Sequence, residues 1–365
     1  MNIQQAIAKA LGKADLAREE MADVIGQIMD GNATPAQIGG FLIALRAKGE
    51  AVDELVGAAT AMRARALSLP SSVDAIDTCG TGGDGAGTIN VSTIAALLIA
   101  GAGGVVAKHG NRALSSKCGS ADVLEALGVV VDAEPAVVTR SLEAAGIGFL
   151  FAPRFHAATR HVGGPRRELG TRTIFNLLGP LTNPAAVRHQ VVGVYAQAWC
   201  GPMAQALGAL GLRRAAVVHG AGNLDEIAVR GETYVGLWDD GELRTFVLTP
   251  RSFGVDELDP DGLAGGDAAF NSSVVKKVIA GHGTDHGERL EAALRASAMT
   301  AALGLELLDP GAFDVHRLPE QYRRAVATTK NGAARLALHK WVEASKSADL
   351  GHLGSLDAAE FAGVE

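Results

Sequence analysis

Apolar residues recur along the first 70 residues with the spacing of amphipathic helices. The segment AQIGGFLIALRAKG follows Thr34 and Pro35, which suit a helix N-cap and first turn, and it ends at Gly49. The stretch SLPSS (residues 68–72) then has the composition of a linker. The pattern predicts an all-helical small domain over residues 1–70, joined to the rest of the chain by a short connection.

From residue 73 onward, short apolar runs alternate with segments of helical periodicity. The runs VDAID, GVVAKHG, VVVDA, IGFLFAP, QVVGVYAQ and RAAVVHG predict strands, and the segments between them predict helices. A hairpin is predicted at ETYVGLWDDGELRTFVL, turning at Asp240 and Gly241, and helices follow after Gly265. Such alternation is typical of βαβ units. We therefore expect an α/β large domain over residues 73–345, with a central, mostly parallel sheet flanked by helices, and a mobile tail over residues 346–365.

Residues 156–188 break this alternation. The segment is rich in arginine and helical in pattern, and it ends in the turn signals Gly179-Pro180 and Asn183-Pro184. We expect part of it to return to the small helical domain.

Composition narrows the possible functions. The net charge of -7 argues against nucleic acid or an anionic membrane as the main partner. Three cysteines without metal-like spacing predict reduced thiols in the cytoplasm. The longest apolar stretch, residues 94–107, is shorter than the roughly 20 residues that span a bilayer. We expect a cytoplasmic protein, in which anionic substrates would need a local cationic site.

A glycine-rich segment, DTCGTGGDGAGTINVST (residues 77–93), follows the first predicted strand. Gly80, Gly82 and Gly85 satisfy the G-x-G-x-x-G pattern of dinucleotide-binding loops. Those loops also need an acid about 20 residues later for the ribose hydroxyls, but the first acid after this segment is Asp122, and Lys108 ends the next predicted strand. The sequence G-x-x-x-x-G-K-[ST] of a P-loop does not occur. The segment therefore predicts a phosphate-bearing substrate rather than a dinucleotide.

Two loops of similar design predict a ligand with more than one phosphate group. Asn90, Ser92 and Thr93 stand at the N-terminus of the next predicted helix, where free N–H groups and the helix dipole favour an anion. The segment AKHGNRALSSKCGSADVLEALG (residues 107–128) again joins a strand end to a helix through polar residues. Its cations, amides and hydroxyls are Lys108, His109, Asn111, Arg112, Ser115, Ser116 and Ser120.

Asp225 and Glu226 follow the strand RAAVVHG. Adjacent carboxylates suit Mg²⁺, which prefers one or two carboxylates together with water and substrate phosphates. Two acids at the start of a helix suit the helix dipole equally well. The predicted polyphosphate site nearby favours the metal.

Three arginines in the segment after residue 156 are candidates for binding an acidic second substrate. A guanidinium fork binds a carboxylate through two hydrogen bonds, and Arg166, Arg167 and Arg172 lie close together in sequence. At least one of them is expected to pair with Glu168 on a solvated helix face.

Together these motifs resemble the anthranilate phosphoribosyltransferase family. The resemblance is carried by DTCGTGGDGAGTINVST, KHGNRALSSKCGSADVLEALG, RRELGTRTIFNLLGPLTNP and HGAGNLDEI, in that order, and extends over about residues 1–310. It implies a helical small domain, an α/β large domain and a hinged cleft between them, in a homodimer formed through the small domains. The implied reaction transfers the phosphoribosyl group of 5-phosphoribosyl 1-diphosphate (PRPP) to the amine of anthranilate, releasing diphosphate, in tryptophan biosynthesis.

The resemblance also implies roles for single residues. Lys108, His109 and Arg166 would be catalytic. Two Mg²⁺ ions per monomer would be held by Ser92, Asp225 and Glu226. Gly80, Asn111 and Arg166 would line the anthranilate path, with Arg166 facing the carboxylate. The residues implied to contact PRPP are Gly80, Gly83, Asp84, Thr88, Asn90, Val91, Ser92, Thr93, Lys108, His109, Gly110, Asn111, Arg112, Ala113, Leu114, Ser115, Ser116 and Ser120.

The chemistry of such a transfer agrees with these roles. Displacement at the anomeric carbon passes through an oxocarbenium-like state, as glycoside chemistry does. Mg²⁺, the amides of the glycine loop and Lys108 can neutralise the departing diphosphate. No residue stands out as a general base, and His109 is the nearest candidate.

The chain departs from the family pattern around the implied anthranilate channel. Ala157 and Thr159 stand where the family usually has proline and methionine, and Gly164-Pro165 replaces a Pro-Val pair. Acceptor preference could therefore differ. Phe270 also stands where an acid is common, and the region after about residue 310 fits least well.

Two alternatives remain at this point. The first is a pyrimidine-nucleoside phosphorylase with the same kind of fold, which Asp225 and Glu226 disfavour because a phosphorylase has no diphosphate for Mg²⁺ to accompany. The second is a non-catalytic nucleic-acid-binding paralogue, which the acidic net charge disfavours.

Overall fold

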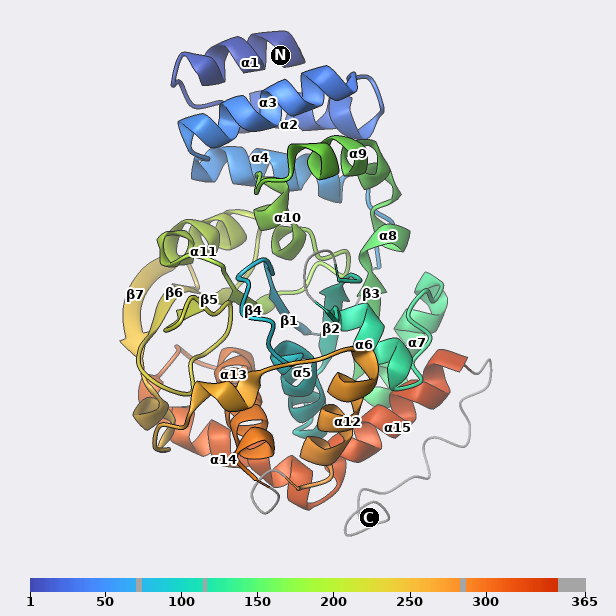
Figure 1. The fold of residues 1–365 in the computed structure, drawn as a ribbon, viewed down its shortest axis with the longest axis vertical. Coiled ribbons are helices and arrows are strands. Elements are labelled where there is room, and N and C mark those ends of the chain that lie inside the picture. Colours follow the sequence, from blue (N-terminus) through green and yellow to red (C-terminus); the bar gives the residue numbers. More distant parts are fainter. Residues whose placement is uncertain (70–73, 114–116, 283–286, 347–365) are drawn as a thin grey trace.

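The computed structural model describes residues 1–69, 74–113, 117–282 and 287–346. Figure 1 shows a stack of helices from the N-terminal part of the chain above a larger body built around a sheet. The predicted linker at residues 68–72 and the predicted tail at residues 346–365 fall mostly outside the described residues. Within the described part of the chain, no helix is both long and apolar enough to cross a membrane.

The small domain is helical, as predicted. It contains α1 (Ile3–Leu11), α2 (Arg18–Met29), α3 (Pro35–Lys48) and α4 (Val52–Arg63). The predicted start of α3 is confirmed, because Thr34 Oγ1 accepts a hydrogen bond from Gln37 N and Pro35 opens the helix. Later segments join this body: α9 (Arg160–Leu169) packs on α3, and α10 (Phe175–Leu181) packs on α4 (Figure 1).

A seven-stranded sheet forms the centre of the large domain. Its strand order is β3-β2-β1-β4-β5-β6-β7; the pairs from β3 to β5 are parallel, and β6 and β7 are antiparallel. The prediction of a mostly parallel sheet is therefore confirmed. The strands are β1 (Ile76–Gly80), β2 (Val106–Gly110), β3 (Ile147–Phe151), β4 (His189–Gly193), β5 (Arg214–Gly220), β6 (Thr233–Asp239) and β7 (Glu242–Leu248).

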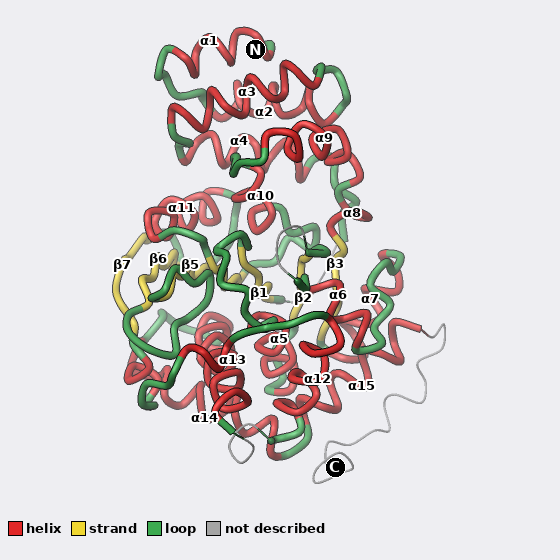
Figure 2. Tube along the Cα trace, in the orientation of Figure 1, coloured by secondary structure: helices red, strands yellow, loops and turns green. Residues whose placement is uncertain are grey.

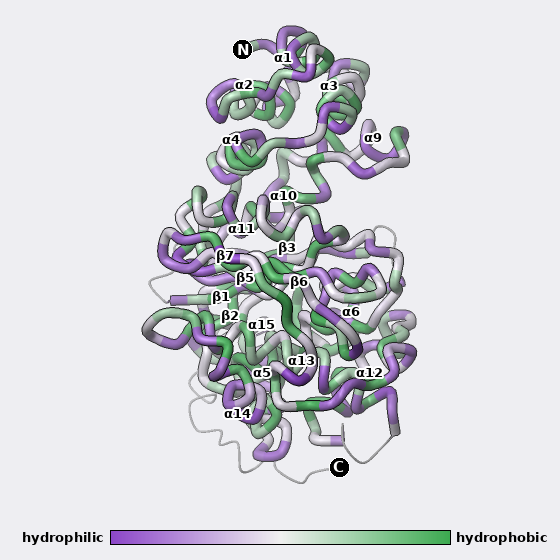
Figure 3. Tube along the Cα trace, turned by 90° about the vertical axis from the view of Figure 1, so that its left-hand side faces the viewer, coloured by the Kyte–Doolittle hydropathy of each residue, from purple (hydrophilic) through white to green (hydrophobic). Residues whose placement is uncertain are grey.

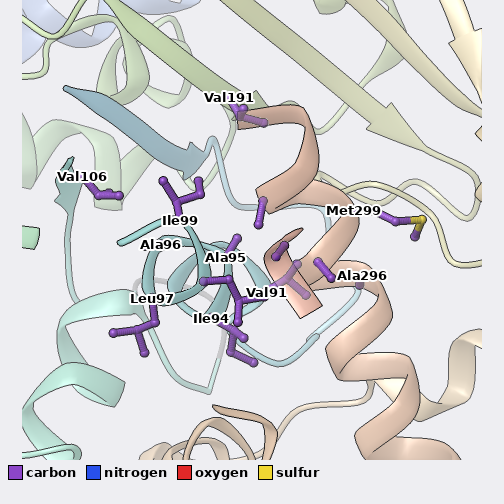
Figure 4. Packing of buried hydrophobic residues seen from close by; sticks show 14 of the residues in the cluster. Val91, Ile94, Ala95, Ala96, Leu97, Ile99, Val106, Val191, Ala296 and Met299 are labelled. Carbon is purple, nitrogen blue, oxygen red and sulfur yellow. The ribbon is translucent and has the colours of Figure 1, made fainter. Parts of the chain in front are cut away.

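Helices cover both faces of this sheet, so the central strands are buried on both sides. Val191 of β4 packs into the core beside α5 (Val91–Gly101) and α13 (Glu288–Leu308), whereas its neighbour Val192 packs into the core shared with α11 (Cys200–Ala209) and the small domain. Figure 4 shows α5 against α13, with Ala95 and Ala296 among the labelled side chains of this core. In the hydropathy colouring of Figure 3, α14 (Leu318–Lys330) carries many hydrophilic positions, in keeping with a helix that is only partly buried.

Further helices complete the cover on the two faces of the sheet. As predicted, the chain after Gly265 is mostly helical. The remaining helices are α6 (Ser120–Ala126), α7 (Pro135–Ala145), α8 (Ala152–Phe155), α12 (Ala268–Ile279), α14 (Leu318–Lys330) and α15 (Ala333–Lys346).

The predicted hairpin is confirmed as β6 and β7. Its two-residue turn places Asp240 at φ 47° and Gly241 at φ 106°. Two consecutive positive φ values match the right-handed twist of the flanking strands, and they explain the choice of Asp-Gly.

Two strand predictions need correction. VVVDA is not a strand: the amide of Val129 donates to Leu124 O at the end of α6, and that of Val130 donates to Ser345 Oγ of α15, so neither joins a ladder. The first strand is β1 rather than VDAID. It reaches Gly80, which is in register with Gly193 of β4, and Val73 lies outside the described residues.

Candidate active site

The candidate site lies beside β1 and β4, where the order in which successive strands are added to the sheet changes direction. β1 to β3 advance toward one edge, and the chain then returns to place β4 on the other side of β1. In open α/β sheets, ligands bind at the carboxyl ends of the strands beside such a point. The glycine loop follows β1, the second loop follows β2, and Asp225 and Glu226 follow β5. Figure 2 shows loops gathered between these strands and helices α8 and α10.

The glycine loop needs glycine for conformation and for close approach. Gly82, Gly83, Gly85 and Gly87 have φ values of 63°, 75°, 79° and 62°. A Cβ added to Gly80 would lie 2.6 Å from Asp225 Oδ2. The loop therefore brings its backbone directly against the loop that follows β5.

A third segment holds the glycine loop from the other side. The amide of Ile89 donates to Leu263 O at 2.9 Å, and the amide of Gly265 donates to Gly87 O at 2.8 Å. A Cβ at Gly265 would lie 2.5 Å from Thr88 O, so only glycine permits this approach. No local pattern predicts this contact, because it joins segments that are distant along the chain.

Three carboxylates meet beside the loop. The amide of Gly82 donates to Asp225 Oδ2 at 2.8 Å, and the amide of Asp225 donates to Asp84 Oδ2 at 3.4 Å. Burial and the charge of Asp84 raise the pKa of Asp225 to about 7. Burial and the charge of Asp225 raise the pKa of Glu226 well above its usual value, against the opposing effect of Lys108. Sequence reasoning had not grouped Asp84 with the other two acids.

These carboxylates have the chemistry of a magnesium site that is completed by substrate. Among the described residues, no three His, Cys, Asp or Glu side chains form a ready-made metal cage. Mg²⁺ usually keeps several waters and takes only one or two carboxylates together with substrate phosphates. Burial and then the neighbouring negative charges raise the pKa values of Asp225 and Glu226, and a divalent cation would favour their ionised forms. Ser92, whose backbone hydrogen-bonds Glu226, lies within the same group.

Lys108 lies beneath the site rather than at its surface. It is buried, and its ammonium donates to Thr78 O and, at 3.1 Å, to Ser92 Oγ. Burial lowers its pKa, against the opposing charge of Asp77. Lys108 therefore supplies positive charge from the floor of the site and also orients Ser92.

The loops enclose a cavity of about 310 Å³, here called the donor cavity. Most residues that the sequence had placed in a phosphate site line it. They are Gly80, Gly83, Asp84, Thr88, Asn90, Ser92, Lys108, His109, Gly110, Asn111, Arg112, Ala113, Ser120, Asp225 and Glu226.

Two predicted contacts do not reach this cavity. Val91 and Thr93 are fully buried, and the Val91 amide already donates to Ile89 O at 2.8 Å. Ser92, which lies between them in the first turn of α5, does line the cavity. The predicted contacts Leu114, Ser115 and Ser116 lie outside the described residues.

Arg112 and Ser120 reach the donor cavity with partners of their own. The Arg112 guanidinium pairs with Asp122 at 3.1 Å and with Glu125 at 2.8 Å, so much of its charge is compensated. Ser120 Oγ donates to Asn111 O at 3.3 Å and fixes the second loop.

A second cavity of about 380 Å³, here called the acceptor cavity, adjoins the first. The two share Cys79, Gly80, Thr81, His109, Gly110, Asn111 and Asn176. The three residues that the sequence had assigned to the anthranilate path, Gly80, Asn111 and Arg166, all line the acceptor cavity.

Arg166 has no acidic partner among the described residues. Its guanidinium lies 5.5 Å from the ring centroid of Phe175, and burial lowers its pKa. A half-buried cation at the wall of a largely apolar cavity is suited to an incoming carboxylate.

The other two candidate arginines are placed differently. Arg167 is exposed. Arg172 donates to Gly83 O and lies with its guanidinium 4.3 Å from the ring centroid of Tyr195, so it supports the glycine loop. Of the three arginines, only Arg166 lines the acceptor cavity.

Two buried histidines lie at the junction of the cavities. The ring of His109 is 5.2 Å from that of His156, His109 Nδ1 is 3.2 Å from Gly179 O, and His156 Nε2 is 2.9 Å from Thr182 O. A carbonyl can only accept, so His109 carries its proton on Nδ1, which leaves Nε2 as an acceptor without a partner in the structure. Burial is the main cause that lowers the pKa of His109 to about 3 and that of His156 to about 4.

Sequence reasoning missed several residues of the acceptor cavity. His156, Phe175, Asn176 and Thr182 line it, and they come from the same segment as Arg166, which was the residue of the 156–188 segment assigned to the anthranilate path. The predicted turn at Gly179-Pro180 is wrong, because both residues lie inside α10; Gly179 O lies 3.2 Å from His109 Nδ1 of β2 and so brings α10 against the end of that strand.

Comparison with known proteins decides the family. Residues 4–66 match "Glycosyl transferase family, helical bundle domain", and residues 72–335 match "Glycosyl transferase family, a/b domain". A relative from Rhizobium meliloti (strain 1021), called anthranilate phosphoribosyltransferase, is 49% identical over 94% of this chain and 98% of its own length. The chain belongs to the anthranilate phosphoribosyltransferase family.

Solved structures of anthranilate phosphoribosyltransferases agree. The enzyme from Thermus thermophilus has a TM-score of 0.85 and 40% identity, with 94% of this chain and 99% of that chain covered. The Saccharomyces cerevisiae enzyme in complex with PRPP and Mg has a TM-score of 0.82 and 26% identity, covering 94% and 97%. The same yeast enzyme has also been solved with 4-fluoroanthranilate, with a TM-score of 0.81.

Proposed function

We propose that this chain transfers the phosphoribosyl group of PRPP to the amine of anthranilate, releasing diphosphate, in tryptophan biosynthesis. One observation carries the proposal. Two cavities meet at His109 and Asn111; one contains the glycine loop and three carboxylates, and the other contains an arginine without an acidic partner among the described residues. The yeast enzyme has been solved with a ligand suited to each kind of cavity: PRPP with Mg in one structure and 4-fluoroanthranilate in another.

PRPP is assigned to the donor cavity. The glycine loop offers backbone amides, and the second loop offers Asn111 and Ser120 as hydrogen-bonding partners. Ser92, Asp225 and Glu226 would hold Mg²⁺ together with the phosphates, and Asp84 joins them in this role; two ions per monomer would suit the paired carboxylates and the diphosphate. Bound Mg²⁺ would neutralise the charge of the leaving diphosphate.

Anthranilate is assigned to the acceptor cavity. Arg166 would pair with its carboxylate, while Phe175, Pro180 and Met62 would contact the ring. Anchoring the carboxylate directs the amine toward Gly80 and Asn111, where the two cavities join. Positioning of this kind is a large part of the catalysis available to a two-substrate reaction.

The transfer forms a bond from the amine nitrogen to the anomeric carbon and breaks the bond from that carbon to the diphosphate oxygen. The amine also loses one proton. His109 Nε2 is suited to accept a hydrogen bond from the amine as that proton becomes acidic. Since the pKa of His109 is about 3, the ring does not retain the proton at neutral pH, and the proton passes on to solvent.

The assembly and location belong to the same proposal. A homodimer formed through the small domain is part of the proposal, and Leu11 of α1 and Ile43 of α3, which are 67% and 41% exposed, are its candidate contacts. The free thiols Cys79, Cys118 and Cys200 support a reducing cytoplasmic location.

Loss of anthranilate fluorescence after addition of PRPP and Mg²⁺ tests the function. We expect loss that depends on all three components. Unchanged fluorescence together with thymidine or uridine phosphorolysis would identify a nucleoside phosphorylase instead. Nucleic-acid binding that weakens steeply with salt, in the absence of turnover, would identify a binding paralogue.

A further inference from the structure

A buried asparagine of α12 lies behind the donor cavity. Asn271 is 1% exposed, and its side chain contacts two residues of the cavity wall, Asn90 and Cys118. Its Nδ2 donates to Asn90 Oδ1 at 2.9 Å, and its Oδ1 accepts from the amide of Gly266 at 2.8 Å. Asn90 lines the donor cavity, whereas Asn271 does not.

The ends of this hydrogen-bond chain fix its direction. The Gly266 amide can only donate, so Asn271 must present Oδ1 to it and Nδ2 to Asn90. At the far end, Asn90 Nδ2 donates to Cys118 O at 3.3 Å, and that carbonyl can only accept. Only one orientation of the Asn90 amide satisfies both contacts.

Asn90 does not use its side chain in the usual way for its position. It is the N-cap residue of α5, yet its side chain makes no capping hydrogen bond. It instead joins the start of α5 to Cys118, just before α6. Asn90 thus ties together the two loops that follow β1 and β2, and Asn271 holds Asn90 in place from a segment 181 residues away.

We propose that Asn271 is a positioning residue for the phosphate-bearing donor. It orients the Asn90 amide so that one Nδ2 hydrogen binds Cys118 O and the second remains for an oxygen of PRPP in the cavity that Asn90 lines. This inference rests on the proposed function for the identity of the donor. It predicts that changes at Asn271 weaken donor binding and spare the acceptor cavity, to which neither asparagine contributes.

Asn271→Asp is the sharpest test, because it keeps the shape and the acceptor for Gly266 but removes the donor to Asn90. We expect the KM for PRPP to rise about tenfold, as loss of a buried hydrogen bond would give, with the KM for anthranilate changed less than about twofold. Asn271→Ser is a second, uncharged variant with the same expected direction. Ser272→Ala is the matched control, since Ser272 is buried on the same turn but donates to Ala269 O.

A double-mutant cycle separates positioning from general structure. In an Asn90→Ala background, the uncharged Asn271→Ser should add no further increase in the KM for PRPP. An undiminished effect in that background, or equal increases in both Michaelis constants, would overturn the proposal. The affinity for diphosphate with Mg²⁺, measured by calorimetry on the same variants, tests the role of Asn271 even if the wild-type protein does not consume anthranilate. A wild-type protein that binds diphosphate but does not consume anthranilate would count against the proposed function, whereas variants that bind diphosphate as well as wild type would count against the role of Asn271.

Discussion

At the scale of single residues, charge compensation separates the side chains that support the fold from those that await a ligand. Arg112 lines a cavity but is paired with Asp122 and Glu125, whereas Arg166 lines a cavity and has no acidic partner in the described chain. Asp225 and Glu226 lie together with raised pKa values, which backbone hydrogen bonds and, for Glu226, the charge of Lys108 oppose only in part. Uncompensated charge of either sign marks a place for a substrate or an ion.

Arg166→Ala should weaken anthranilate much more than PRPP. Truncation removes the cation that faces the carboxylate, so we expect the KM for anthranilate to rise about tenfold to a hundredfold and the KM for PRPP to stay nearly constant. Steady-state kinetics in both substrates measure this. Arg167→Ala, the exposed neighbour, is the control, and equal changes in both constants would contradict the assignment of Arg166.

Asp225→Asn should raise the magnesium requirement. The amide removes a negative charge from the carboxylate cluster, so half-maximal activity should need at least about tenfold more Mg²⁺, as changes around metal sites commonly do. A magnesium titration of the rate measures it. Glu232→Gln makes the same charge change at an exposed position, and a titration of Asp225→Asn that matches this control would reject the metal role.

At the scale of elements, the glycine loop shows how much of the site can be predicted from sequence. Its glycines, and the start of α5 that follows them, were recognisable because conformation and helix termini depend on local residue types. The contact between Gly87 and Gly265, and the wall formed by His156 and Asn176, could not be predicted. They depend on how distant segments pack, which local patterns do not encode. VVVDA likewise has strand composition, but its amides bond to the end of α6 and to α15.

Gly80→Ala should disrupt the meeting of the β1 and β5 loops. The added Cβ would lie 2.6 Å from Asp225 Oδ2, and relief of that contact displaces the carboxylate. Overpacking commonly costs about 1–3 kcal/mol, so we expect the KM for PRPP to rise about tenfold or more.

Gly163→Ala provides the comparison for this variant. Gly163 lies in α9, and a Cβ there meets nothing within 4 Å. We expect it to leave the KM for PRPP unchanged and to raise the melting temperature slightly, because alanine favours the helix by up to about 1 kcal/mol. If Gly80→Ala behaved in the same way, the close approach to Asp225 would be unimportant for donor binding.

At the scale of the whole molecule, the junction between the helical and α/β domains contains two neutral, buried histidines. His109 comes from β2, and His156 comes from the segment between α8 and α9. Each is hydrogen-bonded to the chain near α10, at Gly179 O and Thr182 O. Protonation of either histidine ring would therefore destabilise the folded chain.

Acid should destabilise the protein through this pair. The folded-state pKa values of about 3 and 4 lie below the usual value of 6.5, so below pH 6.5 the unfolded chain binds more protons than the folded one. The free energy of unfolding should then fall by about 1.4 kcal/mol per pH unit for each histidine as pH drops from 6.5 to about 4.

Denaturant titrations at pH 7, 5.5 and 4.5 measure this slope. His156→Gln should reduce it, because one of the two titrating rings is removed. His316→Gln, at an exposed position away from the junction, is the matched control. A slope that is the same in wild type and His156→Gln would exclude His156 as a source of acid sensitivity.

The two cavities differ in where their walls originate along the chain. The donor cavity is assembled from loops after β1, β2 and β5, but most of the acceptor wall comes from one continuous stretch, residues 152–182. Mutations in that stretch can reshape the acceptor side while the donor loops keep their sequence. Exchange of residues 152–182 with the matching segment of a relative would therefore replace most of the acceptor wall in one step, and it is the direct way to test whether this segment decides which aromatic amine is accepted.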